Sequence, residues 1–454
     1  MRVQPARRVA FDVLHGVTAS DAYANLLLPA AIARAGLSAA DAAFATELTY
    51  GTLRRRGYYD AVIALAARRD VERIDAPVLD ALRVSAHQLL ATRVASHAAV
   101  NEGVELAREH GGRGVAGFAN GVLRSIARDD PGQWRTRVLE TAKSDLERLA
   151  LAHAHPVWIV RALRRALDAE GRVDELDDLL AADNASPEVS MLALPGLAEP
   201  PAHAAHAAYS PVGFRLGGGD PEPLVRSSDG RWRVQDEGSQ LAALALTRAD
   251  PVRPGERWLD LCAGPGGKTA LLAAEALAGG ASVSANEPVR ARAGLVRSAL
   301  SAVPLTVEVT EEDGRERVER DLGGFDRVLI DAPCTGLGAL RRRPEARWRK
   351  EPSDVADLSA LQEELFDAGA RALRPGGVLA YVTCSPHRSE TSGVVQSRMR
   401  RWGDRLEPLD TRAVLQSIAR RPLDLAATGS SAQLWPHRHR TDAMFISLFR
   451  RTDG

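Results

Sequence analysis

The chain has 454 residues, enough for about three domains, and its composition, 45% hydrophobic and 26% charged, is that of a globular protein. Basic and acidic residues number 59 each, so the net charge of zero says nothing about nucleic-acid binding. No run of about 18 apolar residues and no signal peptide appear, so we expect a cytoplasmic protein without a membrane segment.

Residues 1–132 are predicted to form an all-α bundle. Apolar residues recur there at three- and four-residue spacing without a convincing strand, as in RVAFDVLHGV and PVLDALRVSAHQLLATR. Helix boundaries are indicated by the capping pair Ser38 and Asp41, by Pro77 in a first turn, and by Gly112 after a periodic run. We therefore expect this segment to have a core of its own.

Arginines stand beside tyrosines in this bundle. Arg54, Arg55 and Arg56 precede Tyr58 and Tyr59, and the two residue types together offer RNA both charge and a stacking surface. The alternative is a solvated arginine face over tyrosines of the core. Without a fold, the sequence leaves both interpretations open.

Residues 133–245 are predicted to form a connector. Helices continue to about residue 185, with an extended segment at His155 to Val160. Prolines and glycines then interrupt any long helix up to about residue 232, while short apolar runs such as VSMLAL persist, so strands and loops are expected. WRVQDEGSQLAALAL changes from a strand to a helix and leads into the last segment.

Residues 246–454 are predicted to form an α/β domain of the Rossmann-like type. Strands such as RWLDLC, SVSAN, DRVLID and GVLAYVT alternate with helical segments. This alternation predicts a doubly wound, mostly parallel sheet, whose ligands bind beyond the carboxyl ends of its strands. The conspicuous residues that follow strands are Cys262, Glu287, Asp313, Asp331, Cys334 and Cys384.

The loop DLCAGPGGKT joins the first strand of this domain to its first helix. It is not a P-loop, because that motif requires glycine where Cys262 stands, and its glycine spacing also fails the dinucleotide pattern. Glu287 follows at the end of the second strand, where a carboxylate can accept both hydroxyls of a ribose. We therefore expect an adenosine-type ligand, with close packing of strand and helix as the alternative reason for the glycines.

The strand FDRVLID ends in Asp331, Pro333 and Cys334. A basic run follows it, composed of Arg341, Arg342, Arg343, Arg347, Arg349 and Lys350. Such a run can position a polyanion through its phosphates. The alternative is an ordinary strand end, where the aspartate caps a turn and the cysteine is buried.

Cys384 stands at the end of another strand. The spacing of the three cysteines argues against a disulfide framework and against a zinc site, so we expect no metal. Two cysteines at one sheet edge, beside a nucleoside-type loop, suit methylation of a pyrimidine. A thiolate adds to carbon 6, and carbon 5 becomes nucleophilic enough to take a methyl group from a sulfonium.

Three segments resemble motifs of the RNA 5-methylcytosine methyltransferases that use S-adenosylmethionine: LDLCAGPGGKT, DAPCTGLGALRRRPEARWR and VTCSPHRSE. VQDEGSQLAA and LWPHRHRTDAMFISLF are similar to flanking motifs of the same family. The N-terminal segment resembles the NusB-type RNA-binding bundle, which points to the Sun/RsmB branch acting on small-subunit ribosomal RNA. The resemblance extends over nearly the whole chain.

The resemblance implies roles for named residues. It implies that S-adenosylmethionine is surrounded by Cys262, Ala263, Gly264, Pro265, Gly266, Gly267, Lys268, Glu287, Asp313 and Asp331. Cys384 is then the nucleophile, and Cys334 resolves the covalent adduct as a base or by assisting one. Asp331 also contacts the cytosine, which must be flipped out of its stack to reach the site. The basic run Arg341 to Lys350 is then the RNA contact.

The resulting prediction is a monomeric methyltransferase that modifies carbon 5 of a cytosine in 16S ribosomal RNA through a covalent cysteine–cytosine intermediate. A transfer RNA target is the first alternative. The second is a ribosome-assembly or antitermination factor that binds RNA without catalysis, against which the retained cysteines and glycine loop argue. The sequence does not indicate which cytosine is methylated.

Overall fold

The computed structural model describes residues 3–20 and 22–452, and the chain divides into two compact units. The helical unit comprises Met1–Arg161, Leu180–Ala185 and Leu340–Lys350, and the sheet unit comprises Ala162–Leu179, Ser186–Ala339 and Glu351–Gly454. These boundaries differ from the three predicted segments, which stay a prediction. Among the described residues, no helix has the length and apolar character needed to cross a membrane.

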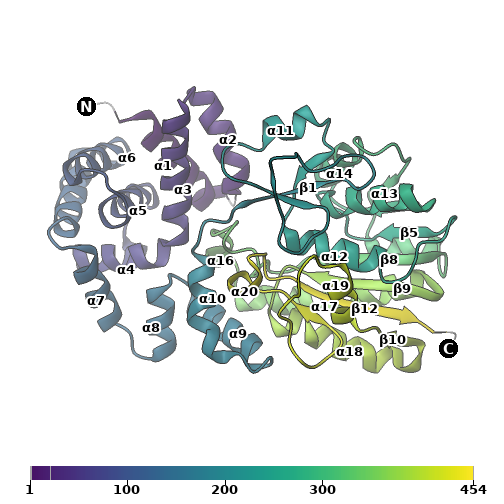
Figure 1. The fold of residues 1–454 in the computed structure, drawn as a ribbon. Helices are drawn as coiled ribbons and strands as arrows, with labels where there is room; N and C mark the ends of the chain where they lie inside the picture. Colours follow the sequence, from purple (N-terminus) through teal and green to yellow (C-terminus); the bar gives the residue numbers. More distant parts are fainter. Residues whose placement is uncertain (1–2, 21, 453–454) are drawn as a thin grey trace. The chain divides into compact units, whose positions relative to one another are not determined.

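The helical unit is built from amphipathic helices (Figure 1). They are α1 (Pro5–Ser20), α2 (Ala24–Ala35), α3 (Ala39–Arg54), α4 (Arg56–Ala67), α5 (Ala76–Ala91), α6 (Ser96–Ile126), α7 (Pro131–Glu140), α8 (Asp145–Ala152) and the later α16 (Ala346–Arg349). As predicted, Ser38 caps α3 by accepting the N–H of Asp41 at 3.2 Å. Gly112 interrupts α6 with a φ of 71°.

The predicted extended segment at His155 is wrong, because α9 (Val157–Asp168) begins there; α10 (Leu176–Asp183) follows.

A small antiparallel sheet occupies the region predicted to hold strands and loops. Its strands are β1 (Val189–Ala193), β2 (Ala205–His206), β3 (Gly213–Leu216) and β4 (Trp232–Val234), in the order β2-β3-β1-β4. The short helix α11 (Glu222–Ser227) precedes β4. The chain then enters α12 (Glu237–Thr247), which is buried nearly all round and is therefore a core helix.

The large sheet has the order β10-β12-β9-β8-β5-β6-β7, with β11 paired to β12. Its strands are β5 (Arg257–Asp260), β6 (Ser282–Asn286), β7 (Glu308–Thr310), β8 (Phe325–Asp331), β9 (Leu373–Thr383), β10 (Leu406–Pro408), β11 (Ala432–Gln433) and β12 (Phe445–Arg451). The five strands from β7 to β9 are parallel, which confirms the Rossmann-like prediction, whereas β12, β10 and β11 add an antiparallel edge.

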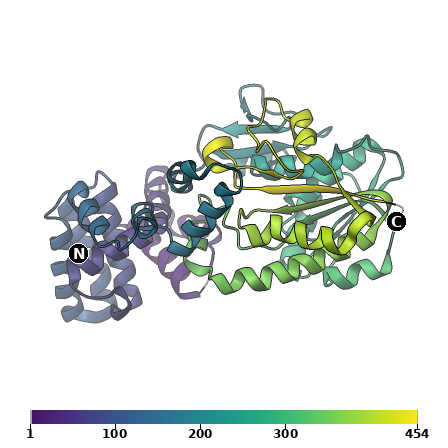
Figure 2. The same cartoon turned by 90° about the horizontal axis from the view of Figure 1, so that it is seen from below.

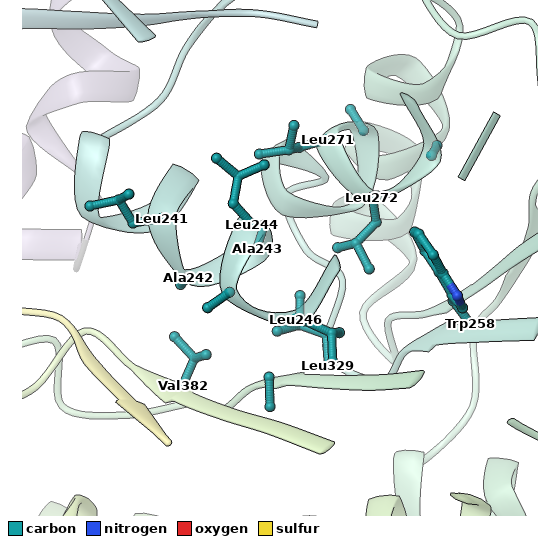
Figure 3. Close-up of a cluster of buried hydrophobic side chains, with 14 of the residues drawn as sticks. Leu241, Ala242, Ala243, Leu244, Leu246, Trp258, Leu271, Leu272, Leu329 and Val382 are labelled. Carbon is teal, nitrogen blue, oxygen red and sulfur yellow. The ribbon is translucent and has the colours of Figure 1, made fainter. Parts of the chain in front are cut away.

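Two apolar cores cover the two faces of this sheet, because successive residues of a strand point to opposite faces. Leu329 of β8 packs with α12 and α13 (Gly267–Gly279), as Figure 3 shows. Its neighbours Val328 and Ile330 pack instead with α17 (Pro352–Ala372). The other helices of the unit are α14 (Arg290–Leu300), α15 (Gly314–Arg317), α18 (Ser392–Trp402), α19 (Thr411–Ile418) and α20 (Pro436–His439); Figure 2 gives a second view.

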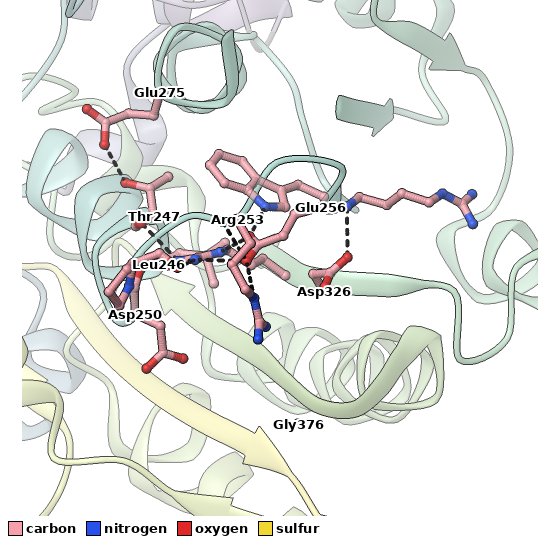
Figure 4. A network of polar contacts seen from close by, with 12 residues as sticks. Leu246, Thr247, Asp250, Arg253, Glu256, Glu275, Asp326 and Gly376 are labelled. Atoms are coloured by element: carbon pink, nitrogen blue, oxygen red, sulfur yellow. Dashed lines mark hydrogen bonds and ion pairs between the residues drawn. The ribbon is translucent and has the colours of Figure 1, made fainter. Parts of the chain in front are cut away.

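A buried ion pair joins β8 to the segment before β5. Figure 4 shows the polar contacts around Glu256. Nε of Arg327 lies 2.8 Å from Oε2 of Glu256, which also accepts the indole N–H of Trp258. The same guanidinium donates to the carbonyl oxygens of Leu246 and Thr247 at the end of α12. These bonds satisfy a buried charge and fix the end of the sheet opposite its carboxyl edge.

Candidate functional site

The carboxyl ends of the parallel strands bring the predicted site residues to one edge of the large sheet. In the ladder between β8 and β9, Asp331 lies opposite Val382. Cys334 and Cys384 therefore follow their strands at the same edge, although they are far apart in the sequence. Parallel strands with a shared register are sufficient to explain this proximity.

The loop after β5 lies against the carboxylate of Glu287 at the end of β6. The N–H of Gly264 donates to Oε2 of Glu287 at 3.1 Å, and the N–H of Val289 donates to Oε1 at 3.0 Å. A Cβ atom added at Gly264 would lie 2.1 Å from Oε2, so only glycine permits this approach. Oε1 retains a further lone pair that can accept a hydroxyl.

The other predicted loop residues are placed along the same turn. Gly266 has a φ of 103°, a backbone conformation that favours glycine, and Gly267 begins α13. The N–H of Ala263 donates to the carbonyl of Asn286, and Pro265 is exposed. Cys262 is half-buried, and the loss of water around its sulfur raises the pKa of the thiol well above its usual range.

Asn286 ties the strand ends together and was missed by the sequence interpretation. Its Nδ2 donates to the carbonyl oxygens of Leu261 and Glu312, at 3.3 and 3.0 Å. Its position directly before Glu287 was the available signal. Asp313, by contrast, caps α15 and is ion-paired with Arg315, whose hydrogen bond lowers the pKa of the carboxyl group.

Lys268 and Asp331 form an ion pair, with 2.7 Å between Nζ and Oδ2. Burial alone would lower the pKa of Lys268, but the adjacent Asp331 carboxylate raises it above its usual value. The ammonium group therefore stays charged at the edge where the two cysteines lie.

The Sγ atoms of Cys334 and Cys384 are 3.4 Å apart, within hydrogen-bond distance for sulfur. The bond from Cys334 and the charge of Lys268 lower the pKa of Cys384 against the opposing effect of burial. The same bond, together with burial, raises the pKa of Cys334 well above its usual range. Either sulfur can donate at this distance, and the positive charge of Lys268 favours the thiolate at Cys384.

Gly338 holds the loop that carries Cys334. Its N–H donates to the carbonyl of Cys384 at 2.9 Å, and its own carbonyl accepts the N–H of Ala443 at 2.8 Å. A Cβ atom at Gly338 would lie 2.1 Å from the carbonyl oxygen of Ala443. The approach of three backbones therefore requires glycine at this position.

Glu390 is a second residue that the sequence interpretation missed. Its buried carboxylate accepts the N–H of Thr335 at 2.7 Å and the hydroxyl groups of Thr335 and Ser385 at 2.5 and 2.6 Å. Thr335 directly follows Cys334, and Ser385 directly follows Cys384. The only sequence signal was the place of Glu390 in the segment VTCSPHRSE.

The predicted basic run belongs to the helical unit, and Arg347 does not suit the predicted phosphate contact. Arg347 is 0% exposed. Its guanidinium donates to the carbonyl oxygens of Arg54, Ala154 and Asp183 and to Oδ1 of Asn184. Arg349 likewise donates to the carbonyl oxygens of Val17 and Ala22. Arg341 is buried, Arg342 and Lys350 are half-buried, and Arg343 is exposed.

The helical unit contains a cavity of about 480 Å³ that is lined by Arg55, Tyr58, Leu90, Pro131, Gly132, Arg135, Ala152, His153, Ala154, Ala181, Asn184 and Ala185. Among these lining residues none is acidic, and Arg55 and Arg135 are exposed. Of the two tyrosines singled out in the sequence, Tyr58 lines the cavity, whereas Tyr59 is buried and bonded to His87. Tyr59 therefore fits the core alternative, whereas an RNA contact of Tyr58 stays a prediction.

Comparison with known proteins identifies the family. The family model described as 16S rRNA methyltransferase RsmB/F matches residues 248–450, and the NusB family model matches residues 4–128. The chain is 32% identical over 413 residues to ribosomal RNA small subunit methyltransferase B of Pseudomonas putida (strain KT2440), covering 87% of this chain and 89% of that protein. The chain belongs to the RsmB/F family. This confirms the predicted family and its NusB-like N-terminal region.

Two further likenesses extend over the full length of this RsmB/F family member. It is 50% identical over 456 residues to the Mycobacterium tuberculosis (strain H37Rv) protein Rv1407, a candidate methyltransferase, covering 99% of this chain and 97% of that protein. The crystal structure of PH0851 superimposes with a TM-score of 0.81 at 22% identity, over 99% of this chain and 100% of that chain. That structure shares the fold.

The chain is therefore an S-adenosylmethionine-dependent RNA methyltransferase. The residues at the sheet edge fit this cofactor. The close approach of Gly264 to Glu287 leaves no space for a side chain at position 264, and Oε1 of Glu287 can accept a ribose hydroxyl. Both the backbone and the acceptor that an adenosine group requires are thus present.

Proposed function

We propose that this RsmB/F family member methylates carbon 5 of a cytosine in 16S ribosomal RNA through a covalent bond between Cys384 and carbon 6. The observation that carries the proposal is the pair of thiols 3.4 Å apart, with a lowered pKa at Cys384 and a raised pKa at Cys334. One sulfur is thereby prepared to attack, and the other to assist it. Monomeric action is part of the same proposal.

The chemistry begins with the thiolate of Cys384, which forms a bond to carbon 6 and moves the electrons of the carbon 5–carbon 6 double bond to carbon 5. Carbon 5 then forms a bond to the methyl group of the sulfonium, and the electrons of the broken sulfur–methyl bond stay on that sulfur, which leaves as a neutral thioether. Release requires loss of the carbon 5 proton to a base and return of the carbon 6–sulfur electrons to Cys384. Cys334 lies close enough to that sulfur to serve as the base or to donate a hydrogen bond to the departing thiolate.

S-adenosylmethionine supplies an electrophilic methyl group when bound. We propose that Glu287 accepts its ribose hydroxyls, that the backbone from Cys262 to Lys268 surrounds it, and that Asp331 faces both the cofactor and the flipped base. Lys268 orients Asp331 through their ion pair. Asp313 remains a proposed contact of the cofactor, although Arg315 already occupies its carboxylate.

RNA must also be held outside the reaction site, since phosphate contacts position a nucleic acid while the pocket selects the base. Of the predicted basic run, the exposed Arg343 and the half-buried Arg342 and Lys350 remain candidates. The cavity lined by Arg55, Tyr58 and Arg135 offers a further contact, because two cationic groups and an aromatic ring without acidic neighbours suit a phosphate and a stacked base.

The proposal is tested by covalent trapping of RNA. Purified Cys334→Ala and Cys384→Ala proteins are each mixed with S-adenosylmethionine and unmethylated 16S ribosomal RNA, and the products are separated on a denaturing gel. We expect an RNA–protein adduct with Cys334→Ala, because attack proceeds and release is slowed. We expect no adduct with Cys384→Ala or with the double variant, because the nucleophile is absent.

The controls separate the alternatives. A reversed pattern would exchange the roles of the two cysteines. An adduct and methyl transfer obtained with transfer RNA, but not with 16S ribosomal RNA, would move the target to transfer RNA. Absence of methyl transfer from the wild-type protein to either RNA, with RNA binding retained, would support the non-catalytic alternative.

A further inference from the structure

We infer that Glu390 is a positioning residue that holds the Cys334 and Cys384 thiols in hydrogen-bond contact. The inference rests on the proposed roles of the two cysteines. Glu390 acts through the residues that follow each cysteine, because no hydrogen bond joins its carboxylate to either sulfur among the described contacts.

One carboxylate connects two loops from different strands. The loop after β8 is held through Thr335, whose N–H and hydroxyl both donate to Glu390. The loop after β9 is held through the hydroxyl of Ser385, which also lies 3.2 Å from the hydroxyl of Thr335. Because Thr335 and Ser385 are each adjacent to a cysteine, these three hydrogen bonds to Glu390 restrict where both Sγ atoms lie.

The carboxylate is itself fixed in place. Nε2 of Gln362 donates to Glu390 at 3.3 Å and to the carbonyl of Pro333 at 2.8 Å. The hydroxyl of Tyr381 donates to the carbonyl of Glu390 at 2.8 Å. Hydrogen bonds to a buried charged acceptor are stronger than those between neutral groups, so this network is a rigid support for the two loops.

The separation of the sulfurs matters because the proposed roles make Cys334 the S–H donor to the Cys384 thiolate, across the observed 3.4 Å. The other charged groups that act on Cys384 are Lys268, Asp331 and Asp442. A shift of the Cys334 loop would remove the hydrogen bond and leave those three charges unchanged. The pKa of the Cys384 thiol should therefore depend on the position of the loop that carries Cys334, and it can be measured without RNA.

The test measures the pH dependence of alkylation of Cys384 by iodoacetamide, with the modified peptide followed by mass spectrometry. In Glu390→Gln we expect the midpoint for Cys384 to move upward by about one pH unit, since loss of one hydrogen bond to a thiolate has this magnitude. We expect the same upward shift, smaller, in Thr335→Val. In a Cys334→Ala background, Glu390→Gln should cause no additional shift, because the donor is already absent.

The matched control is Glu256→Gln, which alters a buried glutamate of the same unit that binds Arg327 and Trp258. It should lower thermal stability and leave the Cys384 midpoint unchanged. The inference is overturned if the midpoint does not move in folded Glu390→Gln, or if it moves equally in Glu256→Gln. It is also overturned if the shift persists in the Cys334→Ala background. Should Glu390→Gln fail to fold, Thr335→Val and Ser385→Ala provide the same readout.

Catalysis supplies an independent measurement. For Glu390→Gln we expect kcat for methyl transfer to fall by about 10²-fold with KM for RNA nearly unchanged, because displaced catalytic groups lose rate rather than binding. Since alkylation needs neither RNA nor methyl transfer, an incorrect RNA target would leave the alkylation result standing. The two proposals can therefore fail separately.

Discussion

Asp260 ends β5 with its carboxyl group buried beneath the glycine loop. Thr269 donates a hydrogen bond to Oδ2 at 2.7 Å. Burial, opposed by the bond from Thr269, raises the pKa of this group to about 7. The folded state thus favours the protonated form. The resulting stabilisation is complete below the unfolded pKa of about 4 and is lost as the pH rises to about 7.

Replacing this carboxyl group by an amide tests the titration. Asp260→Asn keeps an acceptor for Thr269 and removes the ionisation. Between pH 4 and pH 8 we expect the unfolding free energy of the wild-type protein to fall by about 4 kcal/mol relative to the variant. Urea unfolding at several pH values measures this difference. The exposed Asp404→Asn should follow the wild-type curve, and parallel curves for wild type and Asp260→Asn would refute the prediction.

The sequence was sufficient to single out Cys334 and Cys384, because each stands in a short motif at a strand end. It was not sufficient for Asp260, whose acidity depends on burial, or for Glu390, whose partner Thr335 is 55 residues away. Local sequence patterns indicate which residues end a strand. They do not indicate which residues, distant in the sequence, contact those strand ends in the folded protein.

At the scale of elements, alternation of strand and helix patterns predicted the parallel core from β5 to β9. It did not predict that β12 joins this sheet antiparallel to β9, because apolar alternation does not specify the direction of pairing. Likewise, it did not show that the segment Leu340–Lys350 folds with the helices. A run of arginines is interpreted from the sequence as exposed. When these arginines instead donate to backbone carbonyl oxygens, no residue type in the sequence indicates it.

Substitution of Arg347 in α16 tests whether this arginine has a structural role. Its guanidinium is bonded to four acceptors, and burial lowers its pKa to about 10. Arg347→Met leaves these acceptors without a donor, so we expect the Tm of the helical unit to fall by about 5–10 °C in scanning calorimetry. The exposed Arg343→Ala should change the Tm by about 1 °C or less. Equal effects of the two substitutions would contradict a structural role for Arg347.

At the scale of the whole molecule, equal numbers of acidic and basic residues leave RNA affinity to local groups. Many arginines are paired with carboxylates, as in Arg8 with Glu109 and Arg248 with Glu275. The cavity of the helical unit differs, because its lining includes Arg55 and Arg135 and no acidic residue among those described. The salt dependence of RNA affinity distinguishes a local phosphate contact from attraction to the overall charge of the protein, since each phosphate contact releases bound counterions.

Arg55→Ala/Arg135→Ala should therefore weaken RNA binding and reduce the slope of log affinity against log salt by about 1.4, the value for two phosphate contacts to single strands. At saturating RNA we expect kcat to be retained and KM to rise, because the cavity contributes binding and not chemistry.

Arg34→Ala/Arg113→Ala removes the same charge from exposed positions of α2 and α6 that do not line the cavity. Filter binding from about 50 to 300 mM salt compares the two pairs. If both pairs reduce the slope equally, RNA responds to overall charge and the cavity is not an RNA contact; a change confined to the first pair assigns the contact to the cavity.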